Sequence, residues 1–555
     1  MPSRSTGLLL FSLCAALMVY VMGHWTAIID PYVINDDVRQ QLYWMQKWSD
    51  EGMFKDDILT DYARYYVPWG VKAVYRFGAL FMNPVQFSKV VTGILFVITA
   101  GFIFGLGQQF KNDLTGVVAV CFYFFFTGFL RKISGGLSQS FGFPLLTAYL
   151  FFLARGNLFL SALVIMVASV LNPYIFLLCL TTHILYIVVQ YGPALLEKQH
   201  ASLPPEDTSG IKPIQLQPLR KLLLMHMPIL IGIGMMALRY IFLKPEGIGD
   251  LVSWAQMLNH VEYTAAGRYP IIPVRPILYE IGMPWFHLFP FAECGPVAGW
   301  SGVAIICVLA VFGWIRNGFS FDMTGFRVFG YLFPASLFMW CLSYLLMLKL
   351  FLPERYVEFS LTIFFCLFSA VSVLAAMEGM GLRRIIFPWL IVCAVIGGGF
   401  RSYQIGVYDY SDQKNLYEFL KTTPQSSLIA GNPEVMDTIP TFACRKAFVT
   451  YELSHTWIDK YWSIIKKRTF DFFKAYYAED PEEIRKFVRY YGVDYIVVRQ
   501  RDFDRTNLEK GTVYFEPFGS WIKELTKDRT HFALFDSKEF PVVFTGNGVF
   551  VVKTR

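Results

Sequence analysis

Two adjacent acidic residues, Asp36 and Asp37, follow the first apolar stretch of the chain and are its strongest candidates for chemistry. A carboxylate in such a place can accept a proton from a hydroxyl group as a general base, or it can bind a divalent cation. Helix capping is the simpler interpretation of either acid alone, since Asn35 is a good N-cap and acidic side chains favour the first turn of a helix. Capping does not require two acids with Arg39 and Gln40 one turn later. We therefore expect the pair to activate a hydroxyl group or to bind a metal ion, and the sequence leaves open which of Asp36 and Asp37 would act.

Other polar residues of the predicted outer segments could bind a substrate. A second acidic pair, Asp56 and Asp57, precedes the aromatic residues Tyr62, Tyr65, Tyr66 and Trp69. This composition suits a polyhydroxylated ligand against aromatic rings, although Asp57 is equally well explained as a helix start and the aromatic residues as a membrane interface. Arginine binds phosphate through two parallel hydrogen bonds and stays charged. The candidate substrate-binding residues are Arg39, Asp57, Arg268, Arg275, Arg355 and Tyr356. If the site uses a metal, Asp36, Asp37 and Asp57 offer the oxygen ligands that Mg²⁺ or Mn²⁺ prefers.

The elements that must position these residues are mostly membrane helices. Of the 555 residues, 55% are hydrophobic and only 16% are charged, whereas about a quarter is charged in soluble domains. A membrane span needs about 20 apolar residues, or fewer inside a bundle. We expect spans near residues 7–25, 90–109, 114–130, 140–154, 158–171, 174–191, 219–243, 297–315, 327–350, 355–377 and 384–400. The fold class is thus a polytopic α-helical membrane protein with about eleven transmembrane helices.

The basic residues indicate how the chain lies across the membrane. Each short loop on one side carries Arg or Lys, which predicts a cytoplasmic N-terminus. The segment 26–89 is then an outer loop, in which Val38, Leu42, Met45 and Trp48 predict an amphipathic helix along the membrane surface. The net charge of +7 is a topology signal, and no nucleic-acid partner is expected. The outer segments contain no Asn-x-Ser/Thr sequon, which favours a plasma (inner) membrane of bacterial type.

Residues 401–555 differ in character from the membrane part at 1–400. Helices are expected at Asn415–Lys421 and Pro481–Tyr491, and strands at Ser427–Gly431 and Val493–Val498. Alternating helices and strands predict a C-terminal α/β domain, which the odd number of spans makes extracytoplasmic. The segment contains no glycine-rich phosphate loop, so the ligand of this domain is not predicted.

The chain resembles the GT-C superfamily of integral-membrane glycosyltransferases, which includes protein mannosyltransferases, lipid A aminoarabinose transferases and the catalytic subunit of oligosaccharyltransferase. The resemblance covers the layout of the whole chain and depends on the acidic pair in the first outer loop. Three further segments are similar to those of uncharacterised bacterial members: Phe143–Leu146, Asn172–Tyr174 and Leu352–Tyr356.

The resemblance implies that the protein transfers a sugar from a polyprenyl-phosphate donor to a lipid, glycan or protein acceptor at the outer face of the membrane, with inversion. Asp36 or Asp37 would be the base, and Arg355, with Arg268 or Arg275, would hold the departing phosphate. Parts of the superfamily need no metal. The Trp-Trp-Asp signature of oligosaccharyltransferases is lacking, so a peptide asparagine is not the expected acceptor.

Two other classes of function remain open from the sequence. A transporter or lipid flippase would need polar groups or broken helices within the membrane, for which His183 and the Asn172-Pro173 break are candidates. A non-catalytic scaffold for polysaccharide assembly or export would use the outer domain for binding. An enzyme should instead place Asp36 or Asp37 within about 10 Å of Arg355, or of another outer arginine, across a cavity open to the outer leaflet.

Overall fold

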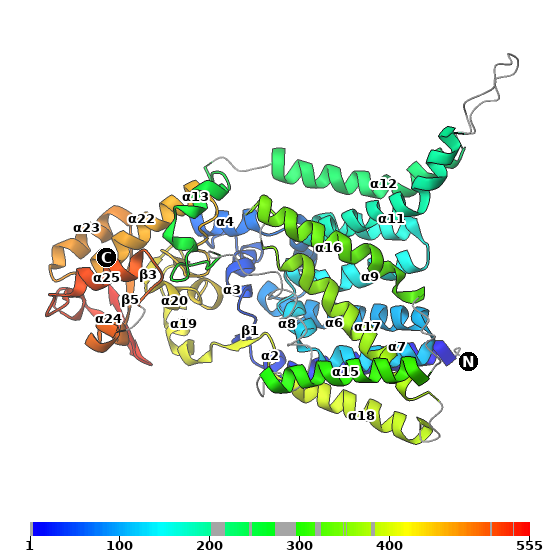
Figure 1. Cartoon of the computed structure of the whole chain (residues 1–555). Coiled ribbons are helices and arrows are strands. Elements are labelled where there is room, and N and C mark those ends of the chain that lie inside the picture. The colour runs from blue at the N-terminus through cyan, green and yellow to red at the C-terminus, as the bar shows by residue number, and fades with distance from the viewer. Residues whose placement is uncertain are drawn as a thin grey trace, which may run out of the picture.

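The computed structural model describes residues 4–200, 217–242, 247–271, 296–316, 324–347, 349–350, 352–378, 383–510, 513–536 and 538–555. A bundle of long helices forms one part of the molecule, and the C-terminal residues form a domain at one end of this bundle (Figure 1). The N-terminus lies at the opposite end of the bundle from the C-terminal domain.

Helices form at every predicted span. Their bounds are α1 Arg4–Gly23, α6 Pro84–Phe110, α7 Asp113–Phe125, α8 Thr127–Ile133, α9 Gly142–Ala154, α10 Leu158–Leu171, α11 Pro173–His200, α12 Gln217–Ala237, α15 Pro296–Arg316, α16 Arg327–Leu345, α17 Arg355–Ala376 and α18 Arg383–Arg401. Six described helices are long and apolar enough to cross a membrane, and α7 with α8, bent by 70°, makes a seventh if the pair is one span. The other four predicted spans are shorter apolar helices among the described residues. The chain is therefore an integral membrane protein, and the count of eleven spans stays a prediction.

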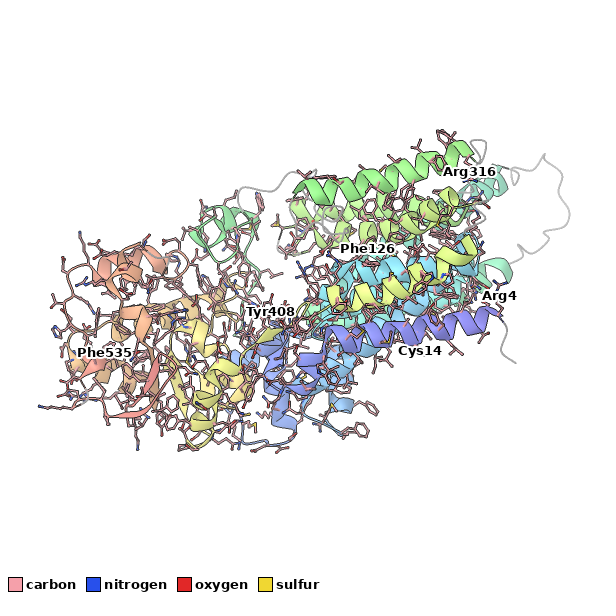
Figure 2. All side chains as sticks on the ribbon, turned by 90° about the horizontal axis from the view of Figure 1, so that it is seen from below. Arg4, Cys14, Phe126, Arg316, Tyr408 and Phe535 are labelled. Atoms are coloured by element: carbon pink, nitrogen blue, oxygen red, sulfur yellow. The ribbon has the colours of Figure 1, made fainter. Side chains whose placement is uncertain are left out.

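The two ends of the bundle differ in what they contact. Arg4, at the start of α1, and Arg316, at the end of α15, both lie at the end far from the C-terminal domain (Figure 2). Tyr408 lies where the bundle meets that domain, and Phe535 lies in the part of the domain away from the bundle. Arg4 and Arg316, which are both predicted to lie on the inner side, thus share one end of the bundle.

The segment 26–89 folds into short elements between the bundle and the C-terminal domain. These are α2 Trp25–Ile29, β1 Val33–Ile34, α3 Val38–Gln41, the 3₁₀-helix η1 Tyr43–Trp48, α4 Ile58–Tyr66 and α5 Trp69–Gly78. Strand β1 pairs antiparallel with β2, Tyr408–Asp409, so that Val33 lies opposite Asp409. This pairing joins the start of the acidic segment to the chain that follows the last membrane helix.

The prediction of an amphipathic surface helix after the acidic pair is wrong. Helix α3 has only four residues, and Val38, Leu42 and Met45 are completely buried. The polar side of the segment is buried too, because the C-terminal domain packs on it: the hydroxyl of Thr441 donates to the carbonyl of Arg39 at 3.1 Å. The segment is therefore buried on all sides and does not lie along the membrane surface, as the apolar spacing had suggested.

The C-terminal domain contains a five-stranded mixed sheet with the order β4-β3-β5-β7-β6. Its strands are β3 Leu428–Gly431, β4 Lys446–Ala447, β5 Tyr495–Arg499, β6 Val542–Gly546 and β7 Val549–Lys553. Strand β3 is parallel to β4 and β5, and β7 is antiparallel to β5 and β6. The helices are α19 Lys414–Lys421, α20 Pro433–Met436, α21 Ile439–Phe442, α22 Asp459–Tyr476, α23 Pro481–Tyr491, α24 Arg505–Lys510 and α25 Phe518–Thr526. The predicted α/β character is confirmed, while the boundary at residue 400 stays a prediction.

A short part of the chain between α12 and α15 also joins this domain. Helix α13, Trp254–Leu258, lies beside α22 (Figure 1). The amide of Val252 donates to the carbonyl of Trp457 at 2.9 Å. Residues 247–271 therefore pack on the segment just before α22.

Candidate active site

A cavity of about 250 Å³ lies where the membrane helices meet the C-terminal domain. The bundle, the first outer segment, residues 268–269 and the segment before α22 all contribute to its wall. The wall consists of Asp37, Gln40, Gln41, Tyr66, Pro68, Ser138, Gln139, Pro173, Tyr174, Tyr240, Arg268, Tyr269, Leu352, Arg355, Glu452, His455 and Trp457. Acidic, basic and aromatic groups therefore face one space that is assembled from distant parts of the sequence.

Asp37 is the member of the first acidic pair that reaches this cavity. Its carboxylate accepts hydrogen bonds from Nε2 of Gln40 at 2.8 Å and from Nε2 of Gln139 at 3.1 Å. It makes no capping bond to α3, although Asp37 immediately precedes that helix. Burial, and then the negative charge of Asp36, raise the pKa of Asp37, while Arg355 opposes the rise. A carboxylate with a raised pKa is a better proton acceptor near neutral pH.

The backbone at Asp37 is fixed from outside its own helix. Its amide donates to Oδ1 of Asn35 at 3.1 Å, and Nδ2 of Asn35 donates to the carbonyl of Gly406 at 2.7 Å. Asn35 thus links the acidic pair to the chain after α18, next to the β1–β2 pairing.

Asp36 has a different set of partners and does not line this cavity. Its carboxylate forms an ion pair with Arg39 and accepts a hydrogen bond from the hydroxyl of Tyr410 at 2.8 Å. The guanidinium of Arg39 lies 4.5 Å from the centre of the Tyr410 ring, and its Nη1 is 3.9 Å from Oδ2 of Asp437. Arg39 is 8% exposed and is absent from the cavity wall. Asp36 and Arg39 thus hold the outer segment against the C-terminal domain.

Two of the three arginines predicted to hold a phosphate line the cavity. Arg355 starts α17, and its guanidinium lies 5.1 Å from the centre of the Tyr174 ring. Arg268 donates to Oε2 of Glu452 at 3.2 Å and lies 3.9 Å from the centre of the Tyr451 ring. The third arginine, Arg275, lies outside the described residues.

Three wall residues that the sequence did not single out come from the C-terminal domain: Glu452, His455 and Trp457. Glu452 accepts hydrogen bonds from Arg268 and, at 3.5 Å, from Nε2 of Gln40, which also binds Asp37. Burial raises the pKa of Glu452. The hydroxyl of Tyr62 lies 2.8 Å from Nδ1 of His455. Burial, and then the charge of Arg268, hold the pKa of His455 well below its usual value, so this imidazole is neutral.

The signal for these residues in the sequence was weak. Glu452, His455 and Trp457 stand in a short stretch of mixed polar and aromatic residues between two regular elements, a composition typical of binding loops. Nothing in the local pattern links this stretch to Asp37, which lies hundreds of residues earlier.

Two predicted substrate-binding residues have structural partners and do not reach the cavity. The carboxylate of Asp57 caps α4, since it accepts from the amide of Thr60 at 3.1 Å and from its hydroxyl at 2.7 Å. Tyr356 is completely buried, donates to the carbonyl of Leu350 at 3.3 Å and packs edge-on against Tyr174. The geometry thus favours the capping interpretation for Asp57 and a supporting position beneath Tyr174 for Tyr356.

The predicted metal ligands do not converge in the structure. Asp36 binds Arg39, Asp37 binds two glutamine amides, and Asp57 caps α4. Over the described ranges of the chain, no group of three or more His, Cys, Asp or Glu residues is placed to hold a metal ion. The positive charges on the cavity wall are those of Arg268 and Arg355.

The fold and the site together define a class of protein: a membrane protein with a helical bundle, a C-terminal α/β domain, and a cavity between them that a carboxylate and two arginines line. No protein-family model matches the chain, and no curated protein matches it. Among solved structures, the Archaeoglobus fulgidus oligosaccharyltransferase with Zn and sulfate is similar, with a TM-score of 0.46 and 11% identity over 99% of this chain and 73% of that one.

A second similar structure is that of ArnT from Cupriavidus metallidurans in the apo state, with a TM-score of 0.41 and 14% identity over 100% of this chain and 99% of that one. The archaeal enzyme AglB from Archaeoglobus fulgidus, solved with an inhibitory peptide and a dolichol-phosphate, has a TM-score of 0.40 and 10% identity over 91% of this chain and 70% of that one. All three TM-scores are below 0.5, so the chemistry has to come from the residues of the cavity.

Proposed function

We propose that this protein is a membrane glycosyltransferase that moves a sugar from a polyprenyl-phosphate donor to an acceptor hydroxyl, with Asp37 as the general base. The observation that carries the proposal is that Asp37, Arg268 and Arg355 line one cavity beside the membrane helices. An acid that can take a proton and cations that can hold a phosphate are the two groups that such a displacement needs.

The reaction proceeds as a single displacement. Asp37 takes the proton of the acceptor hydroxyl, and the hydroxyl oxygen bonds to the anomeric carbon of the donor sugar. The bond from that carbon to the phosphate oxygen breaks, and the electron pair leaves with the lipid phosphate. Arg355 and Arg268 stabilise the charge of the departing phosphate, because a guanidinium can donate two parallel hydrogen bonds to it. A single displacement inverts the configuration at the anomeric carbon.

The hydrogen bonds of Asp37 suit this role. Both amides that it accepts from belong to glutamine side chains, which orient the carboxylate without neutralising its charge. Arg355 is close enough to lower the pKa of Asp37 against the effect of burial, so the base and the phosphate-binding cation interact electrostatically in the same site.

The aromatic side chains of the wall fit the other parts of the substrates. Tyr66, Tyr174, Tyr240, Tyr269 and Trp457 offer ring faces and hydroxyl groups to a sugar, and the neighbouring bundle offers an apolar surface to a prenyl chain. The acceptor can be a lipid, a glycan or a protein hydroxyl.

The direct test measures transfer of radiolabelled sugar from polyprenyl-phosphate donors in membranes that contain the wild type, Asp37→Asn or Asp36→Asn. Transfer by the wild type that is lost in Asp37→Asn and retained in Asp36→Asn supports the proposal. If no donor is used when extracts that contain natural acceptors are added, the proposal fails.

The same proposal places the protein in a plasma (inner) membrane with a cytoplasmic N-terminus and an extracytoplasmic C-terminal domain. It is supported by the position of Arg4 and Arg316 at the end of the bundle opposite that domain (Figure 2). Fusion of alkaline phosphatase after Arg555 should give an active reporter, and fusion of a fluorescent protein that folds only in the cytoplasm should not.

The alternatives of a transporter and of a scaffold are decided by the same transfer assay. The main intramembrane candidate for transport, His183, is 2% exposed and packs edge-on against His226, with ring centres 5.1 Å apart. Substituting His183 by Leu should leave sugar transfer unchanged if the protein is the proposed enzyme.

A further inference from the structure

The C-terminal domain contains a second, larger cavity of about 560 Å³. Its wall consists of Arg39, Asp409, Tyr410, Asp412, Gln413, Tyr417, Glu434, Val435, Thr438, Arg499, Gln500, Arg501, Asn547, Gly548 and Val549. This volume lies within the range of about 300–1,000 Å³ that is typical of small-molecule sites.

The cavity lies where an open α/β sheet is suited to bind a ligand. Strand β3 connects onward to β4 on one side of it, whereas the chain after β5 continues to β6 and β7 on the other side. Such a reversal leaves a crevice at the carboxyl ends of the two strands, and ligands of α/β proteins bind there. Glu434 follows β3, and Arg499 ends β5. In Figure 1, α19 and α20 lie on the side of the sheet that faces the helix bundle.

The turn between β6 and β7 completes the floor of this crevice. Asn547 and Gly548 both have positive φ angles, as a two-residue hairpin turn requires, and Arg499 lies opposite Val549 in the ladder. The amide of Gln500 donates to the carbonyl of Gly548 at 2.9 Å. Backbone hydrogen bonds therefore hold the floor in place.

The charges of the wall balance. Arg39, Arg499 and Arg501 oppose three acids, which are Asp409, Asp412 and Glu434. Arg499 is further neutralised, because its Nε donates to Asp502 at 2.6 Å and its Nη1 to Glu434 at 3.0 Å. A balanced wall favours an uncharged ligand over a phosphate or a polyanion, which would need a surplus of positive charge.

The wall is rich in hydrogen-bonding groups that a hydroxylated ligand can satisfy. Over the ranges that the structure describes, Oε1 of Gln413 is buried and has no hydrogen-bond partner. A buried acceptor of this kind needs a donor, and a hydroxyl group supplies one. At the rim, Arg501 is 67% and Glu434 46% exposed on their side chains, so both remain able to bond a ligand.

We propose that this cavity binds an uncharged oligosaccharide, which, if the proposed function holds, is the part of the acceptor remote from the reacting hydroxyl. The position fits that role: Arg39 lines this cavity and forms an ion pair with Asp36, the residue next to Asp37, which lines the other cavity. The short helix α3 thus separates the two cavities and contributes side chains to both.

The test uses the full chain with Asp37→Asn, so that binding is measured without turnover. The purified protein is applied to an array of defined neutral and acidic oligosaccharides, and its affinity for the bound glycans is measured by calorimetry. Arg501→Ala and Gln413→Leu should each weaken binding about tenfold, since each removes hydrogen bonds to the ligand. Arg489→Ala is the matched control, because this arginine is similarly exposed (70%) and paired with a glutamate but does not line the cavity.

Binding of neutral glycans that both cavity variants weaken, and that the control leaves unchanged, is the expected result. The proposal is overturned if no glycan binds, if acidic glycans or inorganic phosphate bind more tightly than neutral ones, or if the cavity variants bind like their parent. The two proposals fail separately. If the wild type binds glycans and transfers no sugar, the glycan site stands and the enzyme proposal fails. If it transfers sugar and binds no glycan, the enzyme proposal stands and the glycan site fails.

Discussion

Replacing Asp37 by Asn removes the proposed base and changes the shape of the site very little. The carboxylate now accepts from two amides, those of Gln40 and Gln139. An asparagine at this position offers one acceptor and one donor in place of two acceptors. In the described part of the chain, Oε1 of Gln40 is buried without a partner, so a turn of the Gln40 amide lets it accept from the new side chain. The variant can therefore keep both hydrogen bonds of residue 37, although the turned amide of Gln40 gives up its 3.5 Å bond to Glu452.

The effect on folding should be small. Burial, followed by the charge of Asp36, raises the pKa of Asp37 in the folded protein. The folded state then binds more protons than the unfolded state above the ordinary pKa of an aspartate, so this group makes the protein less stable as the pH rises through its raised pKa. Asparagine has no such dependence, and we expect the free energy of unfolding at neutral pH to change by less than about 1 kcal/mol.

The effect on catalysis should be large. A positioned general base contributes about 10²–10⁴-fold to a rate, which corresponds to about 3–5 kcal/mol of transition-state free energy. We expect kcat for sugar transfer to fall by this factor in Asp37→Asn, with KM for the donor nearly unchanged. The assay compares initial rates at equal amounts of folded protein, measured by size-exclusion chromatography in detergent. If Asp37→Asn keeps more than a tenth of the wild-type rate, the assignment of the base is refuted.

Three further substitutions test the rest of the site. Asp36→Asn should remain active and should move the acidic limb of the pH–rate profile to lower pH, since the charge of Asp36 helps to raise the pKa of Asp37; an unmoved limb contradicts this coupling. Arg355→Lys should raise KM for the polyprenyl-phosphate donor about tenfold or more, since lysine cannot form the paired hydrogen bonds of a guanidinium; donor kinetics equal to wild type would argue against phosphate binding there. Asp57→Ala should lower the unfolding free energy by about 0.5–2 kcal/mol through loss of the α4 cap, while Asp57→Ser restores it. Both Asp57 variants should transfer sugar at wild-type rates when folded. Loss of transfer in both would instead indicate that Asp57 binds the substrate.

The regular elements could be predicted from the sequence because their signals are local. Apolar stretches mark the membrane helices, and the pattern around Pro481–Tyr491 marks α23, which Asp480 caps by accepting from the amide of Glu482 at 2.9 Å. The hairpin of β6 and β7 also has a local signal, which is the Asn547-Gly548 pair between two runs of β-branched and aromatic residues.

The site could be predicted only in part, because its wall is assembled by long-range packing. Asp37, Arg268 and Arg355 stand out as charged residues near apolar stretches, and the cavity contains all three. Glu452 and His455 reach it through the fold of the C-terminal domain, which no local pattern encodes. The same packing converted the expected surface helix after Asp37 into a buried four-residue turn, since Thr441 and its neighbours cover its polar side.

The choice between the two adjacent aspartates is likewise a consequence of packing. Successive residues of a helical turn point about 100° apart, so neighbours on such a turn face different surroundings. The β1–β2 pairing and the bond from Asn35 to Gly406 fix the rotation of this turn. Asp36 then forms an ion pair with Arg39 and accepts a hydrogen bond from Tyr410, while Asp37 accepts hydrogen bonds from the two glutamine amides at the cavity. One carboxylate thereby anchors the segment and raises the pKa of the other, which is left with its charge available to a substrate hydroxyl.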